Sequence, residues 1–332
     1  MAPEALRPVV AGVRSVLRST ARSRPRLRRV MATVARELGR ALDDDVYGAG
    51  YFGSGRDPLD RMGLSGYERY DRDTSNANAA AYLVWRWFDV GRTLDVGCAT
   101  GFVVEALREL GVDACGVDVS QYAVEQAAQG ARGHISYGDL TRRLPFPDGR
   151  FDLLTVLETL EHLPPELVPR ALAELRRVTK GYVVATIPSF GLNRNGPDGW
   201  FTVKVRNERV PHYESLGPGY EGPIPYEDLY RDARGEPIEG HLTIASFSWW
   251  TARFEEAGFV RCDRVERAMH PHLARFGLTK YWNLYVFRVP GAPDPGADVR
   301  PPEEIAHWEA NLGLDRRVAA PEDLEAVAAA LG

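Results

Sequence analysis

Apolar runs and amphipathic stretches alternate through the middle of the chain. Apolar runs of strand length are separated by stretches in which apolar residues recur every three or four positions, as on one face of a helix. The runs predicted as strands are Thr93–Gly97, Ala114–Val119, His134–Gly138, Phe151–Leu157 and Tyr182–Ile187. The helices predicted between them lie near Phe102–Leu110, Gln121–Gln129 and Glu166–Val178. Because strands that alternate with helices pair in parallel, the pattern predicts a doubly wound α/β sheet.

The alternation breaks after the fifth predicted strand. Residues 189–240 form a long segment rich in glycine, proline and asparagine, with the aromatic residues Trp200, Phe201, Tyr213, Tyr220, Tyr226 and Tyr230. Irregular insertions at the C-terminal end of a strand often carry function, so we predict a lid whose aromatic side chains contact substrate. The elements predicted beyond it are a helix near Phe247–Ala257 and strands at Cys262–Ala268 and Trp282–Val289.

Charge divides the chain into an arm and a body of opposite sign. Residues 1–40 carry ten arginines and two glutamates, a net charge of +8, whereas the whole chain has −5. Apolar residues at helical spacing predict an amphipathic basic helix in an arm spanning residues 1–45. Its role stays open between docking on the acidic body, which we favour, contact with anionic lipid or nucleic acid, and organelle targeting. The acidic body argues against an enzyme of nucleic acids.

Cysteine count and apolar run length bear on location. Cys98, Cys115 and Cys262 are an odd number at unrelated spacings, which argues against a disulfide framework. No apolar run approaches the ~18 residues of a membrane span, and the N-terminus lacks a long apolar secretory block. We therefore expect a cytoplasmic protein. After the arm, the predicted domain organisation is a cap at residues 46–90, a principal domain over 75–290 and a tail at 291–332.

The strongest local signal is the segment Leu94–Gly101, a strand that ends in a glycine-containing turn and leads into a helix. Such glycines let the backbone turn tightly and approach a ligand at the C-terminal edge of the sheet. Asp118 ends the next strand, where a carboxylate can accept hydrogen bonds from ribose hydroxyls. A nicotinamide enzyme is the structural rival, but the spacing Gly-x-Ala-x-Gly lacks the Gly-x-Gly-x-x-Gly pyrophosphate cradle.

Over about two-thirds of its length the chain resembles the class I S-adenosylmethionine-dependent methyltransferases. The run Asp95-x-Gly97-x-Ala99-x-Gly101 matches their first motif, with Ala99 where a glycine is commonest. The resemblance implies a Rossmann-like, seven-stranded, mostly parallel sheet with an antiparallel C-terminal edge, and S-adenosylmethionine as cofactor. The cofactor-binding residues that it implies are Asp95, Gly97, Cys98, Ala99, Gly101, Asp118, Val119, Asp139, Leu140 and Leu157. Among these, Asp118 would hold the ribose and Asp139 the adenine amino group.

Candidate catalytic residues follow the fourth predicted strand. The sulfonium methyl is already electrophilic, so the enzyme has to align a nucleophile, exclude water and remove a proton. His162, with Glu161 beside it, could act as the general base. Alternatively, Glu158, Glu161 and His162 could bind Mg²⁺ or another divalent cation that lowers the pKa of a bound hydroxyl.

The metal alternative has a second resemblance behind it. Glu158-x-x-Glu161-His162 is similar to the metal-binding motif of ubiquinone-biosynthesis O-methyltransferases and small-RNA 2′-O-methyltransferases. The resemblance implies a further histidine ligand, for which His241 is at the matching place. His212, His270 and His272 lack a paired spacing and are expected on the surface or in loops. Tyr51, Tyr67 and Tyr70 are expected in the cap over the cofactor.

These features favour an O-methyltransferase that acts on a small polar hydroxylated molecule such as a sugar, a glycan precursor or a natural-product scaffold. Metal-independent N- or C-methylation is the main alternative within enzymes. A cofactor-binding scaffold without turnover, joined to a partner enzyme through the basic arm, is the alternative from another class. Peripheral membrane contact through the arm stays open, and the sequence does not predict an oligomeric state.

Overall fold

The computed structural model describes residue 47 and residues 70–89, 91–196, 216, 219–226, 229, 240–275, 283–295 and 298–311. The arm predicted over residues 1–45 lies outside this part of the chain, as does most of the cap predicted over 46–90. Of the side chains singled out above, those outside the described residues are Tyr51, Tyr67, Trp200, Phe201, His212, Tyr213 and Tyr230.

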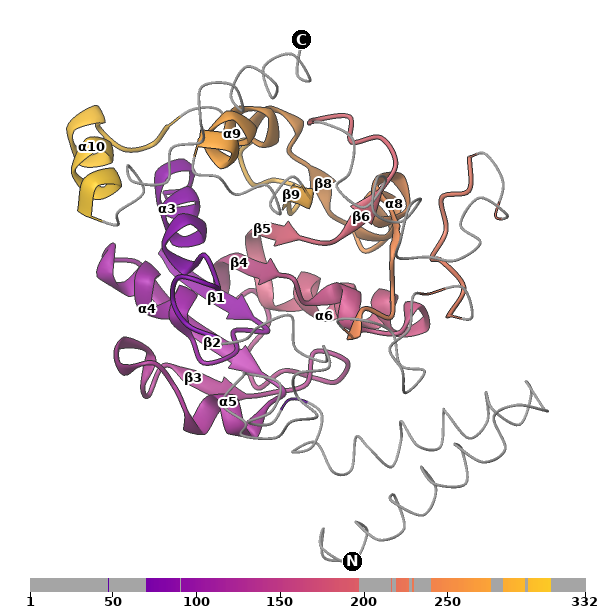
Figure 1. Ribbon diagram of the computed structural model, residues 1–332, viewed down its shortest axis with the longest axis horizontal. Helices are drawn as coiled ribbons and strands as arrows, with labels where there is room; N and C mark the ends of the chain where they lie inside the picture. Colours follow the sequence, from indigo (N-terminus) through magenta and orange to yellow (C-terminus); the bar gives the residue numbers. More distant parts are fainter. Residues whose placement is uncertain are drawn as a thin grey trace, which may run out of the picture.

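The main sheet has the predicted alternation of strands and helices. Its strands follow the order β3-β2-β1-β4-β5-β9-β8 (Figure 1). Their bounds are β1 Arg92–Val96, β2 Asp113–Asp118, β3 Ile135–Tyr137, β4 Phe151–Leu157, β5 Thr179–Thr186, β8 Val260–Arg261 and β9 Leu284–Arg288. Strands β1 to β5 pair in parallel, and β9 runs antiparallel to both β5 and β8. The Rossmann-like, seven-stranded sheet with an antiparallel C-terminal edge is therefore confirmed.

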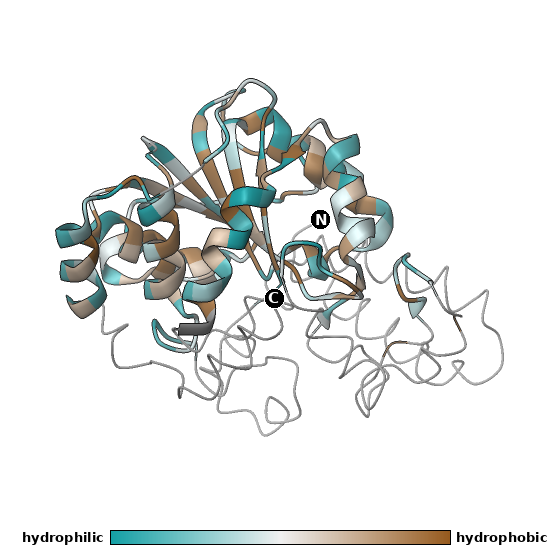
Figure 2. Cartoon of the chain, turned by 90° about the horizontal axis from the view of Figure 1, so that it is seen from above, coloured by the Kyte–Doolittle hydropathy of each residue, from teal (hydrophilic) through white to brown (hydrophobic). Residues whose placement is uncertain are grey.

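Helices cover both faces of this sheet. Their bounds are α3 Ala77–Trp87, α4 Phe102–Glu109, α5 Gln121–Glu125, α6 Val168–Val178, α8 Phe247–Glu256, α9 Asp263–Arg275 and α10 Pro302–Asn311. Side chains alternate along the strands, so Leu153 packs under α3, α4 and α9, whereas Leu154 packs under α6 and α8. The two apolar cores lie on opposite faces of the strands, between the helical layers (Figure 2). Within the described residues, no helix is long and apolar enough to cross a membrane.

The strand predicted at Cys262–Ala268 is wrong, because most of that segment is helical. Strand β8 ends at Arg261, and α9 begins at Asp263. Val265, Met269 and Leu273 are fully buried at helical spacing. The Arg261 guanidinium and the Glu266 carboxylate, 2.8 Å apart and both buried, join the end of β8 to the first turns of α9.

The predictions for two histidines also need correction. His270 was expected on the surface or in a loop, but it lies on α9 with 1% of its surface exposed. Burial lowers the pKa of its imidazole to about 4, so it is neutral at physiological pH. His272 lies on the same helix, half buried, where its ring packs edge-on against Trp87.

The described ends of the 189–240 segment are anchored to the domain. Strand β6, Ser189–Phe190, pairs in parallel with β7, Ala245–Ser246. A small apolar cluster beside them contains Phe190, Leu216, Tyr220, Ile224, Tyr226, Leu229 and Ile244. The Tyr220 hydroxyl donates a hydrogen bond to the Pro223 carbonyl at 2.6 Å. Tyr220 and Tyr226 therefore pack within this cluster, and a lid over substrate stays a prediction.

The tail predicted after residue 290 returns to the first helix. Helix α10 packs on α3, where Trp85 and Trp308 meet edge-on. The buried Arg86 guanidinium on α3 forms an ion pair with Asp298 at 2.6 Å. The Tyr82 hydroxyl on the same helix donates a hydrogen bond to the Glu309 carboxylate. The end of the described chain thus supports the helix that opens the domain.

Candidate active site

The glycine turn after β1 has the geometry expected of a ligand-binding loop. Gly97, Ala99 and Gly101 all adopt left-handed backbone conformations, with φ of 73°, 49° and 82°. A side chain at Gly97 would meet the Thr159 hydroxyl at 2.4 Å, so only glycine fits there. Gly101 is the N-cap of α4, whose free N–H groups follow the loop.

Asp118 lies at the C-terminal end of β2, directly beside this loop. Its Oδ2 accepts a hydrogen bond from the Ala99 N–H at 2.7 Å, and its Oδ1 accepts one from the Ser120 N–H at 2.8 Å. Burial raises the pKa of the Asp118 carboxyl, and these backbone donors oppose the shift. A carboxylate has lone pairs beyond the two used here, so Asp118 can still accept a ribose hydroxyl.

Asp139 follows β3 on the same edge of the sheet, and its carboxylate holds a local turn. Its Oδ1 accepts hydrogen bonds from the Thr141 N–H and hydroxyl, at 2.8 and 2.7 Å. Its Oδ2 lies 3.2 Å from the Arg142 guanidinium. The sequence motif does not show these partners, which compete with the predicted contact to adenine.

The remaining predicted cofactor residues lie at the same end of the sheet. Cys98 is buried in the loop, and Leu140 is buried against the α6 face of the sheet. Val119 follows Asp118 and is partly exposed, as is Leu157 at the end of β4. The structure therefore brings the predicted cofactor residues to one edge of the sheet.

Asp95 differs from the other predicted cofactor residues, because its carboxylate points into the protein. Its Oδ1 accepts a hydrogen bond at 2.6 Å from the Thr155 hydroxyl on β4, and 3% of the residue is exposed. Burial raises the pKa of this carboxyl to about 7, and the nearby charge of Asp118 adds to the shift. Asp95 joins β1 to β4, and this link holds the glycine turn in place.

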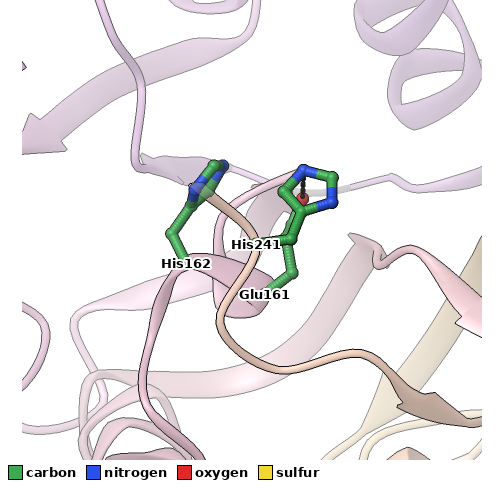
Figure 3. Close-up of side chains that lie close together, drawn as sticks. All are labelled: Glu161, His162 and His241. Carbon is green, nitrogen blue, oxygen red and sulfur yellow. Dashed lines mark ion pairs between the residues drawn. The ribbon is translucent and has the colours of Figure 1, made fainter. Parts of the chain in front are cut away.

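A group of three potential ligands lies past the end of β4. One ligand atom from each of Glu161, His162 and His241 lies within 4.8 Å of the others (Figure 3). The Glu161 Oε1 and His241 Nε2 atoms are 3.9 Å apart. Glu161 is fully buried and His241 nearly so, while His162 is partly exposed. The group therefore combines two buried side chains with one that is partly exposed.

Backbone hydrogen bonds explain why residues 80 positions apart in the chain meet here. The Glu161 carbonyl accepts hydrogen bonds from the N–H groups of Leu242 and Thr243, at 2.8 and 2.9 Å. The Thr243 hydroxyl donates to the Leu163 carbonyl at 2.6 Å. The segment that carries His241 is thus fixed to the 3-10 turn Leu160–His162.

One atom of the His162 imidazole is held by the backbone of the segment that carries His241. Its Nδ1 lies 3.3 Å from the Gly240 carbonyl oxygen. A carbonyl can only accept, so in the neutral ring Nδ1 carries the proton and the lone pair lies on Nε2. In that tautomer, Nε2 is the basic nitrogen of the His162 ring, which can take a proton or bind a cation.

Glu158 does not belong to this group in the described part of the chain. It has a left-handed φ of 50°, and its N–H donates to the Thr186 carbonyl at 2.9 Å. The motif spacing places Glu158 and Glu161 one helical turn apart, but β4 ends at Leu157 and the 3-10 turn begins only at Leu160. Of these two glutamates, only Glu161 belongs to the group with His162 and His241.

Three site residues were missed in the sequence. Thr159 packs against Gly97, with its hydroxyl donating to the Leu157 carbonyl at 3.0 Å. Ser120 caps α5, which a serine directly before a helix could have signalled. Tyr47 lies edge-on to His162, with ring centroids 6.3 Å apart. No sequence signal distinguishes Tyr47 from the other aromatic residues of the N-terminal region.

Comparisons with known proteins agree with this geometry. The methyltransferase domain family matches residues 94–184. The ubiquinone biosynthesis O-methyltransferase of Methylococcus capsulatus is 30% identical over 126 residues, which cover 32% of this chain and 53% of that protein. The corresponding protein of Bordetella avium is 34% identical over 157 residues, covering 45% of this chain and 62% of that protein. The chain thus spans little more than half the length of these relatives.

A solved structure gives a looser likeness. Magnesium protoporphyrin IX methyltransferase from Synechocystis, with bound SAH, is 15% identical and has a TM-score of 0.40, with 69% of this chain and 90% of that chain covered. The sheet order, the glycine turn and the family match together define the class: this chain contains a class I S-adenosylmethionine-dependent methyltransferase domain.

Proposed function

We propose that this protein transfers the methyl group of S-adenosylmethionine to an oxygen atom of a small polar hydroxylated molecule. The observation that carries the proposal is the group of Glu161, His162 and His241 at the edge of the sheet that carries the cofactor loop. An alcohol or phenol has to lose its proton as it attacks the sulfonium methyl, so a proton acceptor or a cation is needed there. The names of the relatives, O-methyltransferases of ubiquinone biosynthesis, support oxygen as the acceptor atom.

His162 is the proposed proton acceptor. Its Nδ1 faces the Gly240 carbonyl, so Nε2 is the basic nitrogen and the atom that would receive the acceptor's proton. Glu161 adds negative charge beside the imidazole and stabilises the imidazolium that forms. Asp118 would hold the ribose and the loop around Gly97 the methionine end, so that the methyl faces the same edge of the sheet.

A divalent cation fits the same residues. One carboxylate and two imidazoles form a donor set that Mg²⁺, Mn²⁺ or Zn²⁺ accepts, and their ligand atoms are close enough to share an ion. When bound, such a cation would lower the pKa of an acceptor hydroxyl. Glu161, His162 and His241 would hold it. Glu158, the fourth predicted ligand, lies outside this group.

The experiment that tests this proposal separates cofactor binding from turnover. S-adenosylmethionine, its demethylated product and NAD are titrated calorimetrically, each with EDTA and with Mg²⁺. Methyl transfer from labelled cofactor is then measured to catechol and to a panel of hexoses. We expect the two methionine-derived ligands to bind, NAD not to bind, and at least one hydroxylated acceptor to be methylated.

The alternatives predict other results. Methylation of an amine or carbon acceptor, with no effect of EDTA, would favour the metal-independent enzyme. Cofactor binding without methylation of any acceptor would favour the scaffold. Binding of NAD in place of the methionine-derived ligands would contradict the proposal altogether.

A further inference from the structure

Tyr47 links the cofactor loop to the Glu161–His162–His241 group. Its backbone carbonyl accepts a hydrogen bond from the Ser120 hydroxyl at 2.6 Å. The Ser120 N–H in turn donates to the Asp118 carboxylate at 2.8 Å. The Tyr47 backbone is therefore attached to the loop that carries the proposed ribose-binding residue.

The Tyr47 side chain reaches the other half of the site. Its ring meets the His162 imidazole edge-on, at an interplanar angle of 87° and a centroid distance of 6.3 Å. His241 meets the same imidazole at 77° and 5.1 Å. The His162 ring is thus in contact with one aromatic ring from the N-terminal region and one from the segment after the insertion.

These contacts restrict His162 in a way that its hydrogen bond alone does not. The contact between Nδ1 and the Gly240 carbonyl fixes one atom and leaves the ring able to rotate about that direction. Edge-to-face contacts with two neighbouring rings define the plane of the imidazole. The direction of the Nε2 lone pair depends on that plane, so it depends on Tyr47.

The environment of the Tyr47 phenol agrees with this location. Burial raises its pKa above the ordinary value, and the charges of Asp118 and Glu161 raise it further. Both carboxylates are therefore near the phenol, one from each half of the site. The phenol keeps its proton at working pH, which excludes a role as general base.

We propose that Tyr47 is a positioning residue for methyl transfer, which orients the His162 imidazole and ties that orientation to the loop at Asp118 and Ser120. The inference rests on the proposed function, because it assigns His162 the task of accepting a proton or binding a cation. The contacts with His162 and Ser120 involve the Tyr47 ring and backbone carbonyl. Phenylalanine keeps both of these contacts, whereas leucine loses the ring.

The test compares the full-length variants Tyr47→Phe and Tyr47→Leu. The first readout is the ring Cε1–H resonance of His162, which is assigned by its loss in His162→Gln, since the chain has seven histidines. We expect this resonance to move in Tyr47→Leu and to stay in Tyr47→Phe. The second readout is methylation of the acceptor found above, where kcat of Tyr47→Leu should fall between roughly tenfold and a hundredfold. The KM for S-adenosylmethionine should change much less.

Tyr182→Leu is the control, because it removes a tyrosine ring that contacts Phe88 at 5.1 Å and a hydroxyl that donates to the Pro293 carbonyl, away from the site. It should leave both readouts unchanged. An unmoved His162 resonance in Tyr47→Leu would overturn the proposal, as would equal losses in Tyr47→Phe and Tyr47→Leu. If no acceptor is methylated at all, the proposed function fails, and the resonance still decides whether Tyr47 orients His162.

Discussion

The cofactor half and the acceptor half of the site are built from different kinds of structure. In the cofactor half, the Ala99 N–H in the turn after β1 donates to the Asp118 carboxylate at the end of β2, and 17 positions separate Gly101 from Asp118. In the acceptor half, Glu161 and His241 come from segments 80 positions apart, and much of the chain between residues 197 and 239 is outside the described residues. The first half is fixed by strand ends that are close in the sequence, and the second depends on hydrogen bonds between segments that are far apart in the sequence.

This difference predicts which property each substitution should change. Changes in the cofactor half should affect stability and cofactor affinity together, because the loop belongs to the sheet. Changes in the acceptor half should affect turnover while the domain stays folded. Three substitutions test that separation.

The largest effect is expected from His162→Gln. Glutamine fills a similar volume but cannot accept a proton at Nε2, so kcat should fall by about 10²–10⁴. Affinity for the demethylated cofactor, measured by calorimetry, should stay within about threefold of the wild type, since a change of that size is under about 1 kcal/mol. A loss of cofactor affinity as large as the loss of kcat would show that the two halves are not separable.

A smaller effect is expected from Gly97→Ala. The left-handed φ of 73° costs alanine roughly 1–2 kcal/mol. The contact with the Thr159 hydroxyl adds about 1–3 kcal/mol more. Urea unfolding should show both losses, and cofactor affinity should fall because the loop must shift.

Gly111→Ala is the control for that substitution. Gly111 has a similar φ of 81°, but nothing lies within 4 Å of a side chain placed there. It should lose only the conformational part of the free energy of unfolding and keep the wild-type affinity for cofactor. Equal destabilisation of both variants would mean that the Thr159 contact has no cost.

The smallest effect is expected from Asp95→Asn, and it depends on pH. The native pKa of about 7 exceeds the ordinary value of about 3.9. The native state therefore holds this proton more tightly, and wild-type stability falls as pH rises from about 4 to about 7. Asparagine keeps a hydrogen-bond acceptor for Thr155 without the charge, so the variant should gain stability relative to the wild type.

The gain should be larger at about pH 8 than at about pH 5, and should reach a few kcal/mol at most. Urea unfolding at the two pH values measures it. Asp113→Asn, an exposed carboxylate on β2, should keep the wild-type dependence on pH. If Asp95→Asn also keeps it, Asp95 is not the group that titrates.

Local patterns explain which parts of this molecule could be predicted from its sequence. The run from Asp95 to Gly101 fixes a strand, a turn and a helix start within a few residues, so its structure follows from the motif. The strand predicted at Cys262–Ala268 was wrong because the extended segment contains only Val260 and Arg261, and the helix begins at Asp263. Pro271 inside α9 also argues against a helix in any reading by propensity alone.

In the candidate site, too, local sequence patterns predict some of the residues and not others. His241 was predicted by a resemblance, and the structure brings it to Glu161 and His162. Glu158 has the right residue type and spacing, but its direction is set by the backbone at the end of β4, which spacing does not report. Tyr47 could not be predicted, because its contact with His162 closes a loop of more than a hundred residues.

The attachment of α10 to α3 has a consequence during protein synthesis. Arg86 leaves the ribosome early, whereas its partner Asp298 is made more than two hundred residues later. Until then, the Arg86 guanidinium lacks the carboxylate that compensates its charge in the folded protein, and burying it unpaired would be strongly unfavourable. Helix α3 can therefore complete its packing against α10 only after Asp298 has been made, whereas the described hydrogen-bond partners of the glycine turn all lie at or before Thr159.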